Sequence, residues 1–160
     1  MTYGEKMKLN LGCGTDWREG YINVDFNKDV KSDLIFDLNH LAYPFEDNSI
    51  SEIIINHALE HLTISIPDFF KECYRILKPN GILHLEVPNA FFWRYRLRFL
   101  CGNMRGSWWS PFHTKLLHPR MIEDSAQIIG FAIVRKKYGL FFLPRSWSEQ
   151  NLVYILRKMI

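Results

Sequence analysis

"LNLGCGTDW", residues Leu9 to Trp17, is the stretch that decides the fold of this chain. The apolar run Lys8–Leu11 predicts a short strand, which ends at a Gly-x-Gly turn. Glycine suits such a turn because the backbone can bend tightly and approach a ligand when no Cβ intervenes. The dinucleotide fingerprint requires a third glycine where this sequence has Trp17, and an acid about 20 residues further on. The turn therefore argues against NAD or FAD.

Two acidic residues follow the turn at the ends of the next predicted strands. Asp25 closes the strand over residues 21–26, and Asp37 closes the strand over residues 33–38. The carboxyl ends of parallel strands meet at one edge of a sheet, so the turn and both acids converge there. A carboxylate accepts hydrogen bonds from vicinal ribose hydroxyls or from an adenine amine. No Lys or Arg adjoins the glycines, so the sequence predicts a pocket for an adenosine group that carries no phosphate.

The rest of the chain alternates between strand and helix patterns. Further strands are predicted over residues 51–57, 82–88, 131–138 and 151–159, with helices over residues 66–79 and 118–129. This alternation is typical of an α/β fold with a mainly parallel sheet. We expect a single domain over residues 1–160, because no linker or repeat divides it, with an aromatic and basic insertion at about 89–117.

Charge is unevenly distributed along the chain, although the net charge is only +3. Residues 1–90 carry 8 Lys/Arg against 14 Asp/Glu, whereas residues 91–145 carry 10 against 2. The acidic half suits a cationic or hydroxyl-rich ligand, and the basic half suits an anionic surface. The three cysteines are widely spaced and form no C-x-x-C pair, which argues against a disulfide framework or a cysteine zinc site.

Taken together, these motifs resemble the class I S-adenosylmethionine-dependent methyltransferases, particularly the small type 11 group. "LNLGCG" is similar to the family's glycine motif, "YINVD" to its acidic strand, and "FDLNHLAYPFEDNSISEIIINHALEHL" to the stretch that follows. "ECYRILKPNGILHLEVPN" is similar to the family's next helix, turn and strand. The resemblance covers residues 8–90 strongly and residues 118–157 less specifically. It implies a Rossmann-like, seven-stranded, mostly parallel sheet of order 3-2-1-4-5-7-6, with the last strand antiparallel and helices on both faces.

The resemblance also implies S-adenosylmethionine as the cofactor and a set of residues that bind it. Gly12 and Gly14 would lie under the methionine part, Asp25 on the ribose, and Asp37 with Leu38 near the adenine. Asn56 and His57 would lie beside the sulfonium and the acceptor. The expected cofactor-binding set is Leu11, Gly12, Cys13, Gly14, Asp25, Phe26, Asp37, Leu38, Asn56 and His57. One departure is clear: the family's first helix has only "TDWREG" in which to form.

His57, Glu60 and His61 form the pattern H-x-x-E-H, which in inverted zinc peptidases supplies two metal ligands and a base. In those enzymes the pattern lies on a long helix, whereas here it directly follows a predicted buried strand. A zinc hydrolase is therefore a remote alternative, and we assign no metal ligands. In a methyltransferase, His57 is the candidate proton acceptor, because an unperturbed pKa near 6.5 suits a base at neutral pH. Glu86 and Asn89 are further candidates to contact the acceptor.

The acceptor is expected to be an O or N nucleophile of a small-molecule, glycan or lipid-linked substrate. Residues 91–112 suit either a lid or contact with a membrane surface, so a non-catalytic cofactor-binding or membrane-surface accessory protein is the alternative. Nucleic acid ranks lower, because Asn56–Leu59 replaces the N/D-P-P-Y/F loop of base methyltransferases. We expect a monomer or homodimer in the cytoplasm, either soluble there or peripheral at the inner membrane surface.

Overall fold

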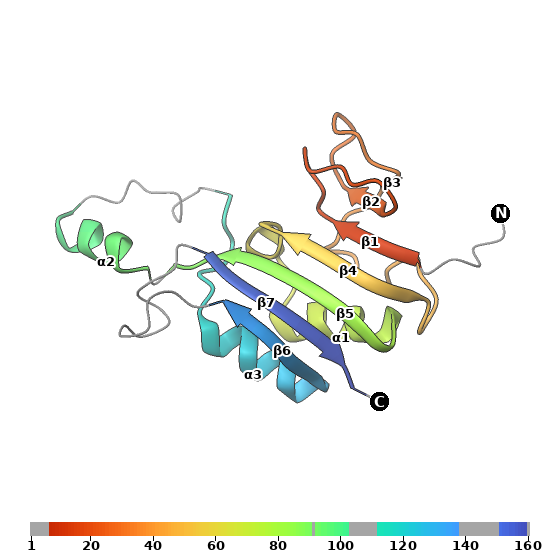
Figure 1. Cartoon of the computed structure of the whole chain (residues 1–160). Helices are drawn as coiled ribbons and strands as arrows, with labels where there is room; N and C mark the ends of the chain where they lie inside the picture. The colour runs from red at the N-terminus through yellow and green to blue at the C-terminus, as the bar shows by residue number, and fades with distance from the viewer. Residues whose placement is uncertain (1–6, 91, 103–111, 138–150, 160) are drawn as a thin grey trace.

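A computed structural model describes residues 7–90, 92–102, 112–137 and 151–159. Strands form one twisted sheet, and the α-helices α1 and α3 pack beside each other against it (Figure 1). The elements are, in chain order, β1 (Met7–Leu11), β2 (Ile22–Asp25), β3 (Leu34–Ile35), β4 (Ile50–Asn56), the 3₁₀-helix η1 (Leu59–His61), α1 (Ile66–Ile76), β5 (Leu77–Pro88), α2 (Trp93–Leu100), α3 (Pro119–Ile129), β6 (Phe131–Lys137) and β7 (Asn151–Lys158).

The seven strands lie in the order β3-β2-β1-β4-β5-β7-β6, which confirms the predicted order. Strands β1 to β5 pair in parallel, and β7 runs antiparallel to both β5 and β6, as predicted. The winding of the sheet reverses between β1 and β4, which are adjacent in space but separated in sequence by β2 and β3. In open α/β sheets a ligand crevice forms outside the carboxyl ends of the strands at such a reversal.

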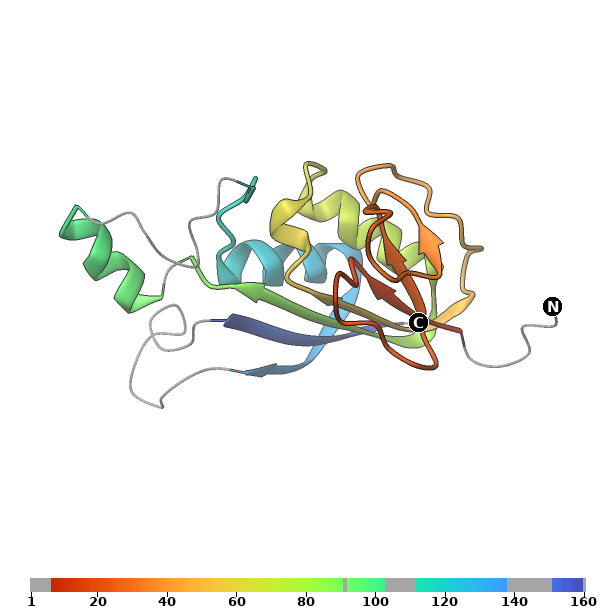
Figure 2. The same ribbon diagram turned by 90° about the horizontal axis from the view of Figure 1, so that it is seen from above.

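The prediction of helices on both faces holds for one face only within the described residues. α1 and α3 contact each other, and Figure 2 shows both on the same side of the sheet. The residues between β1 and β2 form turns and no helix, because too few residues are available for a helical crossover. The opposite face carries the ion pairs of Glu52 with Lys8, at 2.8 Å, and with His84, at 3.2 Å.

Most element boundaries follow the sequence prediction, with two differences. β3 contains only Leu34 and Ile35, because the chain then leaves the sheet toward its carboxyl edge. β5 begins at Leu77, five residues before the predicted Ile82, because Leu77 pairs with Ile50 ahead of an irregularity in the ladder. The helix that precedes it accordingly ends at Ile76.

α1 anchors the covered face of the sheet. Ser65 caps its start by accepting a hydrogen bond from the Asp68 backbone N–H at 3.1 Å, and Pro67 lies in its first turn. Phe69 and Phe70 are fully buried, and the Phe70 ring lies 5.9 Å from that of Phe131 at the start of β6. The apolar stripe of α1 therefore joins the two halves of the sheet into one core.

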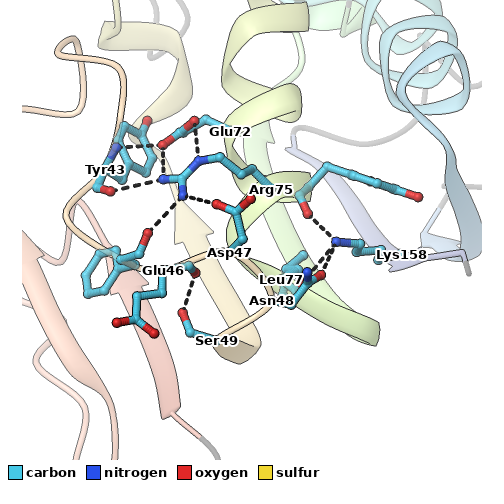
Figure 3. A network of polar contacts seen from close by, with 11 residues as sticks. Tyr43, Glu46, Asp47, Asn48, Ser49, Glu72, Arg75, Leu77 and Lys158 are labelled. Carbon is cyan, nitrogen blue, oxygen red and sulfur yellow. Dashed lines mark hydrogen bonds and ion pairs between the residues drawn. The ribbon is translucent and has the colours of Figure 1, made fainter.

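Two basic side chains, Arg75 and Lys158, connect α1 to neighbouring segments through hydrogen bonds (Figure 3). The Arg75 guanidinium donates to the carbonyls of Tyr43 and Phe45 and to the carboxylates of Asp47 and Glu72, at 2.6–3.1 Å. Because the Tyr43 hydroxyl donates to the Leu38 carbonyl at 3.1 Å, this network extends to the carboxyl edge of the sheet. Lys158 of β7 donates to three oxygens near the end of α1, those of Asn48, Tyr74 and Leu77.

Candidate functional site

A pocket of about 550 Å³ lies at the carboxyl ends of β1, β2 and β4. Its volume falls within the range of about 300–1,000 Å³ typical of small-molecule sites. Its lining is mostly apolar, with two carboxylates and several other polar groups directed into it. The lining residues are Gly12, Gly14, Asp25, Phe26, Phe36, Asp37, Leu38, Asn39, His57, Ala58, His61, Leu62 and Phe112.

The glycine turn forms the floor of this pocket. Gly12 has φ +64°, and a Cβ added there would lie 2.5 Å from the Cβ of Ala58. Gly14 has φ +49°, and a Cβ there would meet no atom within 4 Å. Both glycines thus adopt left-handed backbone that side chains disfavour, but only Gly12 also faces a steric limit. The turn leaves Gly14 open toward whatever occupies the pocket.

Asp25 fixes the turn and keeps capacity for a ligand. Its Oδ2 accepts from the Gly14 backbone N–H at 2.8 Å, and its Oδ1 accepts from the Asn27 N–H at 2.9 Å. A carboxylate offers about four acceptor positions, so about two remain for groups in the pocket. The side chain is buried at the end of β2 and lines the pocket. Asp25 can therefore hold two donor groups of a ligand without losing its own contacts.

Asp37 lies on the opposite wall, two residues beyond β3. Its Oδ1 accepts from the backbone N–H and the side-chain amide of Asn39, at 2.9 and 3.0 Å. The Asn39 side-chain oxygen in turn accepts from the Thr63 N–H at 2.6 Å, which ties this wall to the segment after η1. Leu38 and Leu62 supply apolar surface between these polar groups. This side of the pocket therefore combines apolar side chains with a carboxylate that can accept hydrogen bonds.

His57 lies at the third side of the pocket, directly after β4, and adopts φ +52°. Its Nδ1 lies 3.6 Å from Glu60 Oε1, and its Nε2 lies 3.4 Å from Glu86 Oε1. The side-chain amide of Asn151 donates to the same Glu86 oxygen at 2.7 Å. Interaction with Glu60, and secondarily with Glu86, raises the pKa of His57 against the opposing effect of burial. The arrangement stabilises the protonated imidazole.

The structure brings together seven of the ten residues expected from the sequence to bind the cofactor. The seven that line the pocket are Gly12, Gly14, Asp25, Phe26, Asp37, Leu38 and His57. The other three do not line it: Leu11 is fully buried in the core, Cys13 packs beneath the turn, and Asn56 lies beside the guanidinium of Arg18. Leu11 and Cys13 point away because the strand and turn direct alternate side chains inward and outward.

Sequence reasoning missed the residues that reach the pocket from other segments. Phe112 comes from the end of the insertion, and its carbonyl lies 3.1 Å from His61 Nδ1. No spacing rule in the sequence connects positions 51 residues apart. Ala58, Asn39 and Leu62 are adjacent to predicted residues, so a wider window around each strand end would have found them. Asn89, a candidate for the acceptor side, is fully buried at the end of β5.

Comparison with known proteins identifies this arrangement. A family model described as a methyltransferase domain matches residues 11–85, which run from the last residue of β1 into β5 and contain the glycine turn, both acids and His57. The chain belongs to the class I S-adenosylmethionine-dependent methyltransferases. This agrees with the resemblance seen in the sequence.

The relatives of this methyltransferase domain are of two kinds. A highly reducing polyketide synthase of Aspergillus sclerotiorum is 30% identical over 142 residues, covering 82% of this chain and 5% of that protein. A protein of Mycobacterium tuberculosis strain H37Rv, named "Probable S-adenosylmethionine-dependent methyltransferase", is 27% identical over 157 residues, covering 86% of this chain and 52% of that protein. The chain thus spans only a part of these relatives.

A solved structure shows the same fold. The crystal structure of a SAM-dependent methyltransferase from Archaeoglobus fulgidus superposes with a TM-score of 0.74 at 19% identity. The match covers 97% of this chain and 87% of the archaeal one. At this identity the similarity establishes the fold alone.

The pocket of this methyltransferase fits the cofactor of its family, S-adenosylmethionine. Because Gly14 has no Cβ and no atom lies within 4 Å of where one would be, the methionine part of the cofactor can approach the backbone closely there. The two remaining acceptor positions of Asp25 match a pair of ribose hydroxyls. Asp37 with Leu38 matches an adenine ring and its amine. None of the described residues that line the pocket is Lys or Arg, which suits a cofactor without phosphates.

Proposed function

We propose that this protein transfers a methyl group from S-adenosylmethionine to an oxygen or nitrogen nucleophile of a small-molecule, glycan or lipid-linked acceptor. The observation that carries the proposal is that Gly14, Asp25, Asp37 and His57 all line one pocket. The cofactor, when bound, supplies an electrophilic methyl group on a sulfonium. The contribution of the protein is then to hold both reactants in line and to exclude water, which together account for most of the rate gain in such transfers.

The residues that line the pocket have different roles according to their positions. Asp25 and Asp37 line the pocket and would hold the ribose and adenine ends of the cofactor, and Gly14 and His57 line the part of the pocket where its reactive end would lie. Phe36, Leu38 and Leu62 restrict water around the same site. The acceptor approaches from the side of His57, whose imidazole adjoins the carboxylates of Glu60 and Glu86.

His57 is the proposed proton acceptor. An O–H or N–H nucleophile loses a proton as it attacks, and an imidazole held between Glu60 and Glu86 stabilises that proton once it is taken up. Glu86 is itself held by Asn151 of β7, which fixes the distance between the carboxylate and the ring. Glu60 and Glu86 therefore act as positioning residues for His57.

The experiment is a turnover assay that measures S-adenosylhomocysteine formation with hydroxyl, amine and lipid-linked acceptors. We expect acceptor-dependent turnover that His57→Asn lowers by about 10²-fold or more, the typical contribution of a general base. The affinity of the same variant for S-adenosylhomocysteine should stay within a few-fold. Cofactor binding without turnover on any acceptor class would overturn the proposal and favour a non-catalytic accessory protein.

We also propose that α2 contacts an anionic membrane surface, where a lipid-linked acceptor would be presented. Trp93, Leu97 and Leu100 recur at i, i+4 and i+7 and are 39%, 54% and 81% exposed, whereas Tyr95 on the other side of the helix is 5% exposed. α2 carries three arginines and no acid, which complements negatively charged headgroups. In Figure 1 the helix lies beyond the end of β5, away from the sheet.

The proposed contact is with the membrane surface and not through the membrane. No helix in the described parts of the chain is long and apolar enough to cross a membrane. An interfacial helix instead lies in the headgroup plane with its apolar stripe inserted and its arginines flanking it. Residues 91 and 103–111 of the predicted contact segment lie outside the described residues. The oligomeric state and the cellular location stay predictions.

A further inference from the structure

Three side chains on the acceptor side of the pocket form a cluster in which the methyltransferase chemistry above assigns a role to Glu60 alone, that of positioning His57. Glu60 and His61 belong to η1, and His113 comes from the segment that precedes α3. One ligand atom from each residue lies within 4.8 Å of the others. His57 is not a member of this group, so the cluster differs from the H-x-x-E-H triad that the sequence suggests.

Glu60 gives the first sign that the cluster accommodates a ligand. The residue is only 1% exposed, and its Oε2 has no hydrogen-bond partner among the described residues. Its other oxygen lies 3.6 Å from His57 Nδ1, beyond a good hydrogen bond. A buried carboxylate oxygen without a partner is costly, and buried charges are normally paired or coordinate metals. A cation at the cluster would satisfy this oxygen.

His61 gives the second sign, because its proton position follows from its neighbour. Its Nδ1 lies 3.1 Å from the carbonyl oxygen of Phe112. A carbonyl oxygen only accepts, so Nδ1 carries the hydrogen and Nε2 keeps its lone pair. Metal-binding histidines are characteristically oriented in this way, with the second ring nitrogen donating to a carbonyl or a carboxylate. His61 is thus prepared to bind a cation through Nε2.

The backbone holds His113 against these two residues. Thr114, its neighbour, donates from its N–H to the Glu60 carbonyl at 2.9 Å and from its hydroxyl to the Leu62 carbonyl at 2.6 Å. Lys115 donates to the same Leu62 carbonyl. The imidazoles of His61 and His113 meet edge to face, with ring centroids 4.8 Å apart. The two segments are therefore fastened together on both sides of His113.

We propose that Glu60, His61 and His113 bind a divalent transition-metal ion, with Zn²⁺ the best match. Two imidazole nitrogens and one carboxylate oxygen are a common ligand set for catalytic zinc and for non-haem iron, and three protein ligands leave a coordination position open. Ligand atoms at about 2.0–2.2 Å from zinc lie roughly 3.3 Å apart. The present separations are up to 4.8 Å, so the three ligand atoms would have to approach one another by up to about 1.5 Å when the ion binds.

His61 and Phe112 line the pocket, so an ion held by the cluster would lie beside it and could bind an acceptor there. This role rests on the proposed methyl transfer and narrows it to an acceptor that presents a hydroxyl. Such a hydroxyl bound to the ion has a lowered pKa. Its proton leaves to His57 or to water, its oxygen forms a bond to the methyl carbon, and the carbon–sulfur bond breaks with its electron pair remaining on sulfur.

The test measures metal binding without S-adenosylmethionine, so that its result does not depend on the proposed methyl transfer. All proteins carry Cys101→Ser, because Cys101 is exposed and a free thiol can bind zinc on its own. Chelator-treated protein is titrated with Zn²⁺ by calorimetry and with Co²⁺ by its visible absorption. We compare wild-type cluster residues with His113→Asn and Glu60→Gln. The matched control is His118→Asn, in which asparagine can replace the histidine that caps α3.

The expected result is one equivalent of Zn²⁺ or Co²⁺ bound by the wild-type cluster and by His118→Asn. His113→Asn and Glu60→Gln should each weaken binding by at least about tenfold while circular dichroism shows unchanged folding. Absence of stoichiometric binding by the wild-type cluster at millimolar Zn²⁺ would overturn the proposal. Equal affinities of His113→Asn and His118→Asn would also overturn it, because the ion would then lie elsewhere.

Discussion

Substituting Gly12 by alanine tests how the glycine turn shapes the cofactor pocket. Two costs add at this position: φ is +64°, and the new Cβ would lie 2.5 Å from the Ala58 Cβ, where an ordinary carbon–carbon contact is about 3.5–4.0 Å. Left-handed backbone costs about 1–2 kcal/mol for a residue with a Cβ. The overlap costs a further 1–3 kcal/mol or so, as in other overpacked sites. We expect Gly12→Ala to lower the free energy of unfolding by about 2–5 kcal/mol.

Gly20→Ala separates the two costs. Gly20 has φ +77°, but a Cβ there would meet no atom within 4 Å, so this variant pays the backbone cost alone. Urea unfolding should place Gly12→Ala about 1–3 kcal/mol below Gly20→Ala. Calorimetry with S-adenosylhomocysteine should show an affinity loss of at least about tenfold for Gly12→Ala only, because Ala58 lines the pocket.

A second substitution provides a rescue. Ala58→Gly removes the atom that collides, so the double variant Gly12→Ala/Ala58→Gly should recover most of the difference in unfolding free energy from Gly20→Ala. Equal unfolding free energies for Gly12→Ala and Gly20→Ala, together with equal ligand affinities, would refute the close approach of the turn to Ala58.

Three further predictions follow from the charges and the exposed helix. Wild type should sediment with phosphatidylserine-containing vesicles and not with vesicles of phosphatidylcholine alone. Leu97→Glu should abolish this sedimentation, whereas Ile128→Glu, the same change to glutamate at an exposed residue of α3, should not. Equal sedimentation of the two variants would exclude α2 as the contact. Lys158→Met leaves three oxygens without their donor and should lower the free energy of unfolding by about 2–4 kcal/mol in urea; a loss below about 0.5 kcal/mol would contradict the network in Figure 3. Hydrogen bonds from the backbone and side chain of Asn23 lower the pKa of Asp33, so its contribution is present above the unfolded value of about 3.9 and is lost as pH falls through the lowered folded value. The urea midpoint should therefore fall less between neutral and acidic pH for Asp33→Asn than for wild type, and identical pH profiles would remove Asp33 as a source of acid sensitivity.

The sequence predicts the cofactor side of the pocket well, because its residues are local to strand ends. Gly12, Asp25 and Asp37 each follow a short apolar run, and parallel strands bring such ends to one edge. The order of the strands came instead from the resemblance to a family, because spacing alone does not fix which strands are neighbours.

The acceptor side is predicted poorly, for a physical reason. His113 and Phe112 reach the site through hydrogen bonds between Thr114 and the carbonyls of Glu60 and Leu62, more than 50 residues away in the chain. Backbone carbonyls have no sequence signature. The pattern H-x-x-E-H indicates the correct neighbourhood, but only the fold shows that His113 joins Glu60 and His61 while His57 faces Glu86.

The most direct test of the central claim is calorimetry of wild type and Asp25→Ala with S-adenosylmethionine and S-adenosylhomocysteine. Asp25 holds the Gly14 N–H and retains about two acceptor positions, and hydrogen bonds to a charged group contribute about 1.5–3 kcal/mol each. We predict one ligand bound per wild-type chain and an affinity at least about 10²-fold weaker for Asp25→Ala. An absence of binding by folded wild type at millimolar ligand, or an Asp25→Ala variant that binds as well as wild type, would contradict the account.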